Sequence, residues 1–384
     1  MKIPFHKPIF PKNINSILKD STNSGWVTTG PKVKLFEEKL SEYLSSKYVI
    51  ALNSCTAALH LGLAAKGIGQ GDKFIAPSYT FVATVEVGEY LGASPVLVDC
   101  NYDNFNIDLD KVEELLAKDK HKKIKAVIPV YFAGKPFDYK RLNSIAKKYN
   151  LFVLEDAAHA LETISELKVR NTVALSFYAN KNITTGGEGG ALATNSRLIA
   201  EKVRKLSLHG ISKDGWQRFK VGAKWKYDVS ELGYKYNMTD IAASFGLNQL
   251  ENINSWRFRR IEIVNKYTLF LSEIEGVDNP DFVKNENHSW HLYIIKIISE
   301  KWKISRDEII NKLNEKGIGT SVHYIPVHMH SYYFNKYGYK PSDFPISKKL
   351  SESVISLPLY PRMNNEQVEY IASTLLNIWN NNKL

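Results

Sequence analysis

The feature that most constrains this chain is the alternation of short apolar runs with helical patterns through its first two-thirds. Strand–helix–strand repetition with nearly all-apolar strands predicts a mostly parallel sheet with helices on both faces. The predicted strands span residues 47–52, 73–77, 94–100, 125–132, 151–156, 172–179 and 189–194. The predicted helices among them span residues 56–67, 80–92, 108–118 and 137–150. Sheets of this kind bind ligands beyond the carboxyl ends of their strands.

The pattern changes after about residue 240. A long helical stretch at 238–274 leads into a smaller unit with a strand at 291–298 and helices at 306–317 and 365–381. We therefore predict a larger α/β domain at residues 1–250, which includes an N-terminal arm, and a smaller C-terminal α/β domain at residues 251–384. The length of 384 residues fits two domains.

The chain carries 51 basic and 40 acidic residues, which gives a formal net charge of +11. Such an excess suits nucleic acid, a membrane surface or an anionic small substrate. The basic clusters at 118–125 and 257–260 are not interleaved with aromatic residues. We therefore interpret the charge as a solvated basic surface and expect no binding of nucleic acid.

Only two cysteines are present, Cys55 and Cys100, so a disulfide framework is excluded and no metal-type spacing exists. The first twenty residues lack the apolar segment of a signal peptide, and no run of 18 apolar residues occurs. These features predict a cytoplasmic protein without a membrane span or a metal site.

Polar residues interrupt the apolar pattern where strands end. The sequence NSCTAALHLGL at 53–63 passes from a strand into a helix, and its small residues suit either an anion site or an ordinary N-cap. The strand at 151–156 ends in Glu155 and Asp156, with His159 soon after. A carboxylate there needs a cationic partner, such as a protonated pyridine nitrogen, unless it caps a helix.

Two further clusters follow. Lys181 lies between an apolar strand and a glycine-rich turn, where a desolvated amine could act as a nucleophile, although such lysines are usually in surface loops. Asn237, Thr239 and Asp240 precede a helix and are typical of a cap. An anion site, a carboxylate and an amine in this order are the set that pyridoxal phosphate requires.

At these residues the chain resembles the nucleotide-sugar aminotransferases of the DegT/StrS group, within the fold type I pyridoxal phosphate enzymes. The resemblance runs in family order from residue 25 to about 328, and SLPLYPRM at 356–363 extends it. The matching stretches are GWVTTGPKVKLFEEKL, NSCTAALHLGL, APSYTFVATVE, EDAAHA, SFYANKNITTGGEGGALAT, LGYKYNMTDIAA and GIGTSVHYIPVH.

The resemblance implies roles for the residues around the cofactor ring. Lys181 is implied to form the Schiff base with pyridoxal phosphate and to move the proton between its C4′ and the substrate carbon. Asp156 is implied to hold the pyridinium nitrogen, His159 to lie near the 3-hydroxyl, and Phe81 to stack on the ring.

It also implies contacts to the phosphate and the substrate. Thr56, the backbone N–H of Ala57 and Ser176 are implied to hold the phosphate. Asn237 is implied to reach the phosphate of the neighbouring subunit, so we expect a homodimer with a shared active site. The implied substrate residues are Thr29, His323, Tyr324 and His328.

The implied function is transfer of an amino group from an amino acid, L-glutamate, to a nucleotide-linked keto sugar, a 4-keto-6-deoxyhexose. The product is expected to enter a surface polysaccharide, such as an O-antigen, or another glycan. A 3-keto sugar aminotransferase and a non-catalytic pyridoxal-phosphate-binding regulator are the alternatives. The presence of Lys181 disfavours a related dehydratase, which has histidine there, and Lys181 with Asp156 disfavours the regulator.

Overall fold

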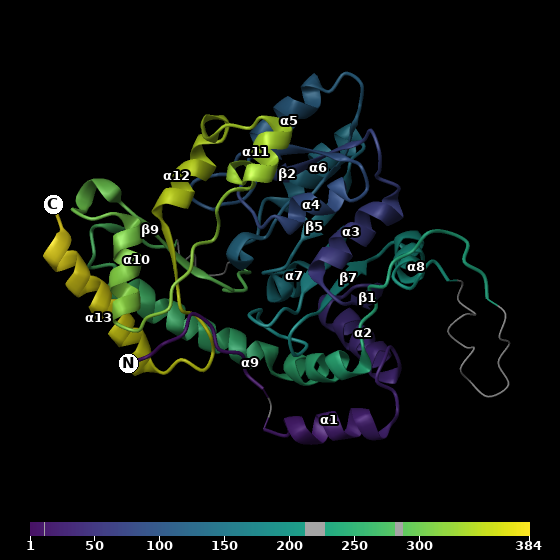
Figure 1. Cartoon of the computed structure of the whole chain (residues 1–384), viewed down its shortest axis with the longest axis horizontal. Helices are drawn as coiled ribbons and strands as arrows, with labels where there is room; N and C mark the ends of the chain where they lie inside the picture. Colours follow the sequence, from purple (N-terminus) through teal and green to yellow (C-terminus); the bar gives the residue numbers. More distant parts are fainter. Residues whose placement is uncertain (11, 212–226, 281–286) are drawn as a thin grey trace.

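The computed structural model describes residues 1–10, 12–211, 227–280 and 287–384. Seven strands form a central sheet in the order β1-β7-β6-β5-β4-β2-β3 (Figure 1). The strands are β1 (Tyr48–Leu52), β2 (Lys73–Pro77), β3 (Ser94–Val98), β4 (Ile124–Val127), β5 (Phe152–Asp156), β6 (Thr172–Ser176) and β7 (Gly190–Thr194).

The sheet is mostly parallel, as the sequence predicts, and β7 is the exception. Strands β3, β2, β4, β5 and β6 pair in parallel along the order of the sheet. Strand β7 runs antiparallel to both neighbours, with Leu52 opposite Gly190 on β1 and Ser176 opposite Gly190 on β6. Residues 177–189 between β6 and β7 contain no helix, so they return the chain antiparallel instead of making a crossover.

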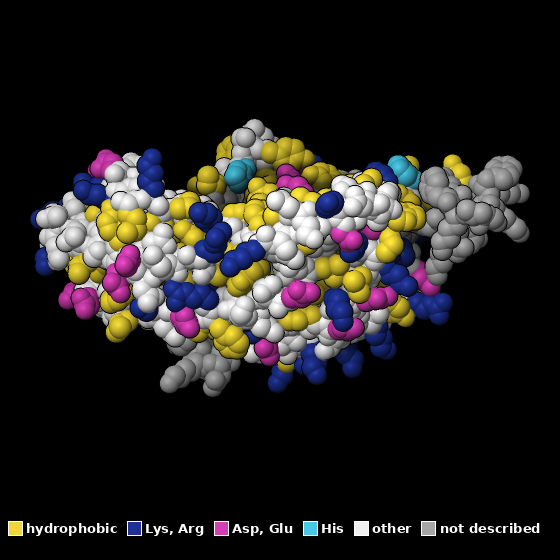
Figure 2. Space-filling view, turned by 90° about the horizontal axis from the view of Figure 1, so that it is seen from below, with side chains coloured by type: hydrophobic (Ala, Val, Ile, Leu, Met, Phe, Trp, Pro, Cys, Tyr) yellow, Lys and Arg dark blue, Asp and Glu magenta, His cyan; other side chains and the backbone are white. Residues whose placement is uncertain are grey.

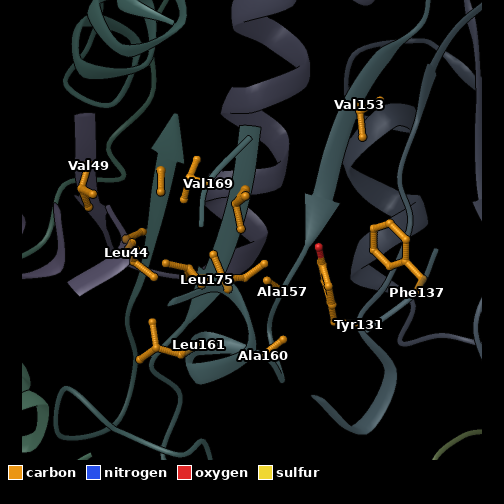
Figure 3. Packing of buried hydrophobic residues seen from close by; sticks show 14 of the residues in the cluster. Leu44, Val49, Tyr131, Phe137, Val153, Ala157, Ala160, Leu161, Val169 and Leu175 are labelled. Atoms are coloured by element: carbon orange, nitrogen blue, oxygen red, sulfur yellow. The ribbon is translucent and has the colours of Figure 1, made fainter. Parts of the chain in front are cut away.

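Helices cover both faces of the sheet. The first face carries α2 (Pro31–Leu44), α5 (Leu109–Lys118), α6 (Tyr139–Tyr149), α7 (Leu161–Leu167) and the start of α9 (Asp240–Leu271); the second carries α3 (Cys55–Lys66), α4 (Ala83–Glu89) and α8 (Arg197–Leu206). Side chains of a strand alternate between the two faces. On β1, Val49 belongs to the first core and Ile50 to the second. Figure 3 shows part of the first core, where Leu175 and Leu161 lie near Leu44.

A smaller antiparallel sheet follows, in the order β10-β9-β8. Its strands are β8 (Val277–Asp278), β9 (Tyr293–Ile297) and β10 (Val354–Leu357), and its helices include α10 (Arg306–Glu315) and α13 (Asn365–Asn382). It has its own core, to which the second half of α9 contributes Tyr267 and Leu271, whereas Ile253 of α9 belongs to the core of the large sheet. The domain boundary predicted at residue 250 falls inside this continuous helix and stays a prediction.

Two helices before β10 and the N-terminal segment pack onto these units. Helices α11 (Ser331–Tyr337) and α12 (Pro345–Ser353) lie beside the large sheet (Figure 1), and Tyr333 belongs to its second core. Helix α1 (Ile14–Asn23) packs along α9, and Ile3 pairs with Ile318 of the small unit. Among the helices of the described ranges, none has the length and apolar character needed to cross a bilayer.

Two predicted strands of the large sheet extend at least three residues too far at their carboxyl ends, and the strand predicted at 94–100 ends two residues earlier, at Val98. The strand predicted at 125–132 ends at Val127, because Pro129 cannot donate a hydrogen bond to a neighbouring strand, and a short 3-10 turn occupies Phe132–Gly134. The strand predicted at 172–179 ends at Ser176, where the chain turns toward Lys181. Both strands therefore stop at the edge where the polar residues gather.

Candidate active site

A cavity of about 510 Å³ lies beyond the carboxyl ends of β5 and β6. Because β5 and β6 are parallel neighbours, their ends meet at one edge of the sheet. The start of α3 and the segment before α4 complete one wall, and residues 323–324 complete another. Eight residues singled out from the sequence line it: Thr56, Phe81, Asp156, His159, Ser176, Lys181, His323 and Tyr324.

Lys181 lies in the loop between β6 and β7, with its backbone N–H donated to the Tyr178 carbonyl at 2.9 Å. Burial lowers the pKa of its amine from 10.5 to about 8, while Cys55 and Asp156 act in the opposite direction. A substantial fraction of the amine is therefore neutral near physiological pH, as a nucleophile requires.

The two carboxylates at the end of β5 point in different directions. Glu155 accepts hydrogen bonds from the Tyr131 hydroxyl at 2.8 Å and from the Asn171 amide at 2.6 Å, away from the cavity. Asp156 faces the cavity and accepts hydrogen bonds from the Thr84 hydroxyl at 2.7 Å and the Ala158 N–H at 3.1 Å. Burial raises the pKa of Asp156, and these two donors and Lys181 oppose that rise. Among the described residues Asp156 makes no ion pair, so a cationic ligand atom is the partner its position suits.

The first turn of α3 forms a further wall of the cavity, where Cys55 Sγ lies 4.0 Å from Asp156 Oδ1. Ser54 caps this helix and accepts the Ala57 N–H at 3.0 Å, so the Ala57 donor is already used and Ala57 does not line this cavity. Thr56 does line it, next to the positive end of the helix dipole. The closeness of β7 depends on Gly190, because a Cβ atom there would lie 2.3 Å from the Ser54 carbonyl carbon.

Aromatic and imidazole side chains form the remaining wall of the cavity. The Tyr324 hydroxyl lies 3.1 Å from His159 Nε2, and the buried Nδ1 of His159 has no partner among the described residues. Burial lowers the pKa of His159. Phe81 is 57% exposed at the mouth, with its ring 5.9 Å from that of Tyr324. His323 is held by Ser356, whose hydroxyl lies 2.8 Å from its Nδ1.

Three other predicted site residues do not line the cavity of this chain. The Asn237 amide donates to the Thr29 hydroxyl at 2.7 Å, and that hydroxyl donates to the Met238 carbonyl at 2.6 Å. His328 is fully buried, with its ring 4.6 Å from that of Phe344. The structure of one chain therefore gives no support to the active-site roles expected for Thr29, Asn237 and His328.

The sequence analysis missed the residues that support the site from behind. Asn182 follows Lys181 directly, and its amide donates to both oxygens of Glu162, at 3.0 and 2.8 Å. Glu162 forms a buried ion pair with Arg260 of α9. Thr84 lies in the quoted stretch APSYTFVATVE, from which only Phe81 was singled out. These contacts join residues that lie far apart in the sequence, so no local sequence pattern predicts them.

Comparison with known proteins agrees with this geometry. The DegT/DnrJ/EryC1/StrS aminotransferase family matches residues 9–376. The chain is 42% identical over 384 residues to the uncharacterized protein MJ1066 of Methanocaldococcus jannaschii, covering 99% of this chain and 98% of that one. It is 40% identical over 381 residues to the spore coat polysaccharide biosynthesis protein SpsC of Bacillus subtilis, covering 98% and 97%.

A solved structure is similar over nearly the whole chain. Spr1654 from Streptococcus pneumoniae, described as a sugar aminotransferase, superposes in its PMP form with a TM-score of 0.90 at 33% identity, covering 99% of this chain and all of that one. Its PLP form superposes with a TM-score of 0.88 at 32% identity.

Proposed function

Because the chain belongs to the DegT/DnrJ/EryC1/StrS aminotransferase family, we propose that it transfers the amino group of L-glutamate to a nucleotide-linked 4-keto-6-deoxyhexose. Membership makes the chain a pyridoxal-phosphate-dependent sugar aminotransferase of fold type I. The predictions of family, fold, enzyme class and cofactor are thereby confirmed. The amino donor, the sugar and the role of each site residue are our proposal.

The residues of the cavity fit pyridoxal phosphate. A buried carboxylate without an ion-pair partner among the described residues, Asp156, suits a protonated ring nitrogen. The unpartnered Nδ1 of His159 can take a polar ring substituent, and the start of α3 can take the phosphate. The convergence of Lys181, Asp156 and the first turn of α3 on one cavity is the observation that carries the proposal.

Each side chain then has a defined task. When bound, pyridoxal phosphate supplies an aldehyde that takes up the amino group and a ring that withdraws electrons from the reacting carbon. Lys181 holds that aldehyde and moves a proton at its Nζ, which a pKa of about 8 permits near neutral pH. Asp156 accepts the N–H of the ring. Phe81, at the mouth of the cavity, would cover one face of the ring.

The phosphate is assigned to the wall formed by the first turn of α3 and the end of β6. Thr56 and Ser176 offer hydroxyl groups on the cavity surface, and the N–H groups of the first turn of α3 add a positive dipole. The Ala57 N–H takes part only if the Ser54 hydroxyl, its present acceptor, turns away.

The substrate class is supported by the relatives and by charge. SpsC is named for spore coat polysaccharide biosynthesis, and Spr1654 is described as a sugar aminotransferase. His323 and Tyr324 line the same cavity as Lys181, which supports their assignment to the sugar. A net charge of +11 raises the encounter rate with a nucleotide diphosphate. In the face shown in Figure 2, Lys and Arg are dispersed among Asp and Glu, which does not favour a nucleic-acid groove.

We also propose a homodimer, located in the cytoplasm, in which Asn237 serves the site of the other subunit. Asn237 lies outside its own cavity but pairs with Leu52, two residues before the cap of α3. A residue placed beside the phosphate wall on the outer side is suited to an interface role. Thr29 holds the Asn237 amide in this position.

The test is a screen of UDP-, dTDP- and GDP-linked 4-keto and 3-keto sugars with L-glutamate, read by mass spectrometry of the amino sugar and by 2-oxoglutarate release. We expect turnover of a 4-keto-6-deoxy sugar and none with Lys181→Ala. Turnover of 3-keto sugars alone would select the first alternative. A protein that binds the cofactor and turns over no sugar would be the regulator.

A further inference from the structure

A pair of buried threonine hydroxyls lies beside Asp156: Thr80 belongs to the cavity wall, and Thr84 lies behind that wall. The Thr84 hydroxyl lies 2.7 Å from Asp156 Oδ2, and the Thr80 hydroxyl lies 2.9 Å from that of Thr84. The side chains are almost fully buried, with exposed fractions of 0% for Thr84, 2% for Thr80 and 5% for Asp156. Neither threonine has a task in the function proposed above.

The carboxylate fixes the direction of both hydrogen bonds. An ionised carboxylate can only accept, so Thr84 must donate to Asp156. The single proton of Thr84 is then used, and its oxygen accepts the proton of Thr80. The donors therefore run from Thr80 through Thr84 to Asp156, while the other carboxylate oxygen accepts the Ala158 N–H at 3.1 Å.

Close packing holds α4 where this geometry requires it. Gly88 of α4 sits on β2 so tightly that a Cβ atom there would lie 2.1 Å from the Phe74 ring. Val85 and Val87 are fully buried in the same core. Thr84, which is fully buried, is therefore held at the end of β5 by the packing of its helix.

We propose that Thr84 is a positioning residue that orients the Asp156 carboxylate and keeps it ionised for the cofactor ring nitrogen. The inference rests on the role proposed for Asp156. Without the Thr84 donor, burial favours the protonated acid, because a buried charge needs its hydrogen bonds. The proton shared by the carboxylate and the ring nitrogen then moves toward the carboxylate, and the ring withdraws fewer electrons.

The first experiment compares Thr84→Val, which has nearly the same shape but no donor, with Thr84→Ser, which keeps the hydroxyl. Apoprotein is loaded with pyridoxal phosphate labelled with ¹⁵N in the ring, and the ring nitrogen resonance is recorded. We expect the pyridinium position in the wild type and Thr84→Ser, and a shift toward unprotonated pyridine in Thr84→Val. Turnover should fall in Thr84→Val, mainly through kcat.

Thr80→Val provides a second variant if Thr84→Val does not fold. It removes the outer donor and leaves Thr84 in place, so we expect a smaller shift in the same direction. An unchanged ring resonance in the folded variants overturns the proposal, as does a Thr84→Ser variant that behaves like Thr84→Val.

A double-mutant cycle with Asp156→Asn separates positioning from general structural support. Thr84→Val should weaken the affinity of the apoprotein for pyridoxal phosphate by about tenfold or more in the wild-type background, the cost of a lost hydrogen bond to a charge. It should have little effect in the Asp156→Asn background. An equal loss in both backgrounds would assign Thr84 to packing alone. Wild-type affinity and turnover in Asp156→Asn would instead refute the proposed role of Asp156.

Discussion

An amine that reacts near neutral pH has to lose part of its hydration. The Lys181 amine loses it by burial in the cavity that Cys55 and Asp156 also line. Desolvation disfavours the ammonium form and outweighs the opposing effect of Cys55 and Asp156, which leaves a pKa of about 8. The same environment keeps Asp156 an acceptor through Thr84 and Ala158. The reactivity of the site is thus set by a few side chains at one strand edge.

We expect the rate at which apoprotein captures pyridoxal phosphate covalently to rise with pH and to level off above about 8. Below this pKa the amine is protonated and cannot attack, so the rate should fall about tenfold per pH unit. Stopped-flow absorbance between pH 6 and 10 measures it, with Lys181→Ala as the control that captures nothing. A midpoint near 10.5 would mean that Lys181 is not desolvated.

At the scale of elements, the site depends on how closely β7 approaches α3. The contact is between backbones: a Cβ atom on Gly190 would lie 2.3 Å from the Ser54 carbonyl carbon and 2.5 Å from the Cys55 nitrogen. Backbone atoms cannot move aside as a flexible side chain can. The position of the first turn of α3, and with it the proposed phosphate site, is therefore set by a glycine on the neighbouring strand.

Gly190→Ala should displace the start of α3 and lower both stability and cofactor affinity. We expect a loss of about 1–3 kcal/mol in the free energy of unfolding, as for other overpacked sites. Gly187→Ala is the matched control, because a Cβ atom there would meet nothing within 4 Å and the change should stay within about 0.5 kcal/mol. Urea unfolding and titration with pyridoxal phosphate measure both quantities. Equal behaviour of the two variants would contradict this account.

At the scale of the whole molecule, α9 connects the two cores, and a buried ion pair fixes it to the large one. Glu162 of α7 and Arg260 of α9 are 0% and 2% exposed. Asn182, next to Lys181 in the loop between β6 and β7, donates a hydrogen bond to Glu162. A second pair joins the same helices near the surface, between Glu166 and Arg257. The two pairs differ mainly in burial.

Glu162→Gln should cost about 3–5 kcal/mol of unfolding free energy, because it leaves the Arg260 charge buried without a counter-charge. Glu166→Gln removes a carboxylate that is 49% exposed and should cost at most about 1 kcal/mol. Chemical unfolding of both variants tests the difference. Similar losses would show that solvent reaches Arg260 as freely as Arg257.

The proposed dimer makes a separate prediction. Inactive Lys181→Ala chains, mixed with chains inactivated by a bulky substitution of Asn237, should recover part of the activity. Each mixed dimer would contain one composite site with both residues intact. Subunit exchange is verified with differently tagged chains. Mixed dimers that form without any activity would place Asn237 outside the site of its partner.

The sequence by itself determined the elements whose signal is local. Apolar β-branched runs identified the strands of the large sheet, and the small residues at 53–57 identified the start of α3, because neighbouring residues decide both. The helix start at 53–57, Asp156 and Lys181, in this order along the chain, pointed to pyridoxal phosphate, and the family resemblance implied the same cofactor. Helix α2 was not predicted, although its buried residues Val33, Phe36 and Leu40 follow a helical period.

Only the tertiary structure decided which polar residues face the cavity. It turned Asp156 toward the cavity and Glu155 away from it, buried His328, and brought Thr84 to a carboxylate 72 residues away. It also ran β7 antiparallel between its neighbours. These outcomes depend on which elements pack together and how closely, and such contacts between distant residues leave no period or motif in the sequence.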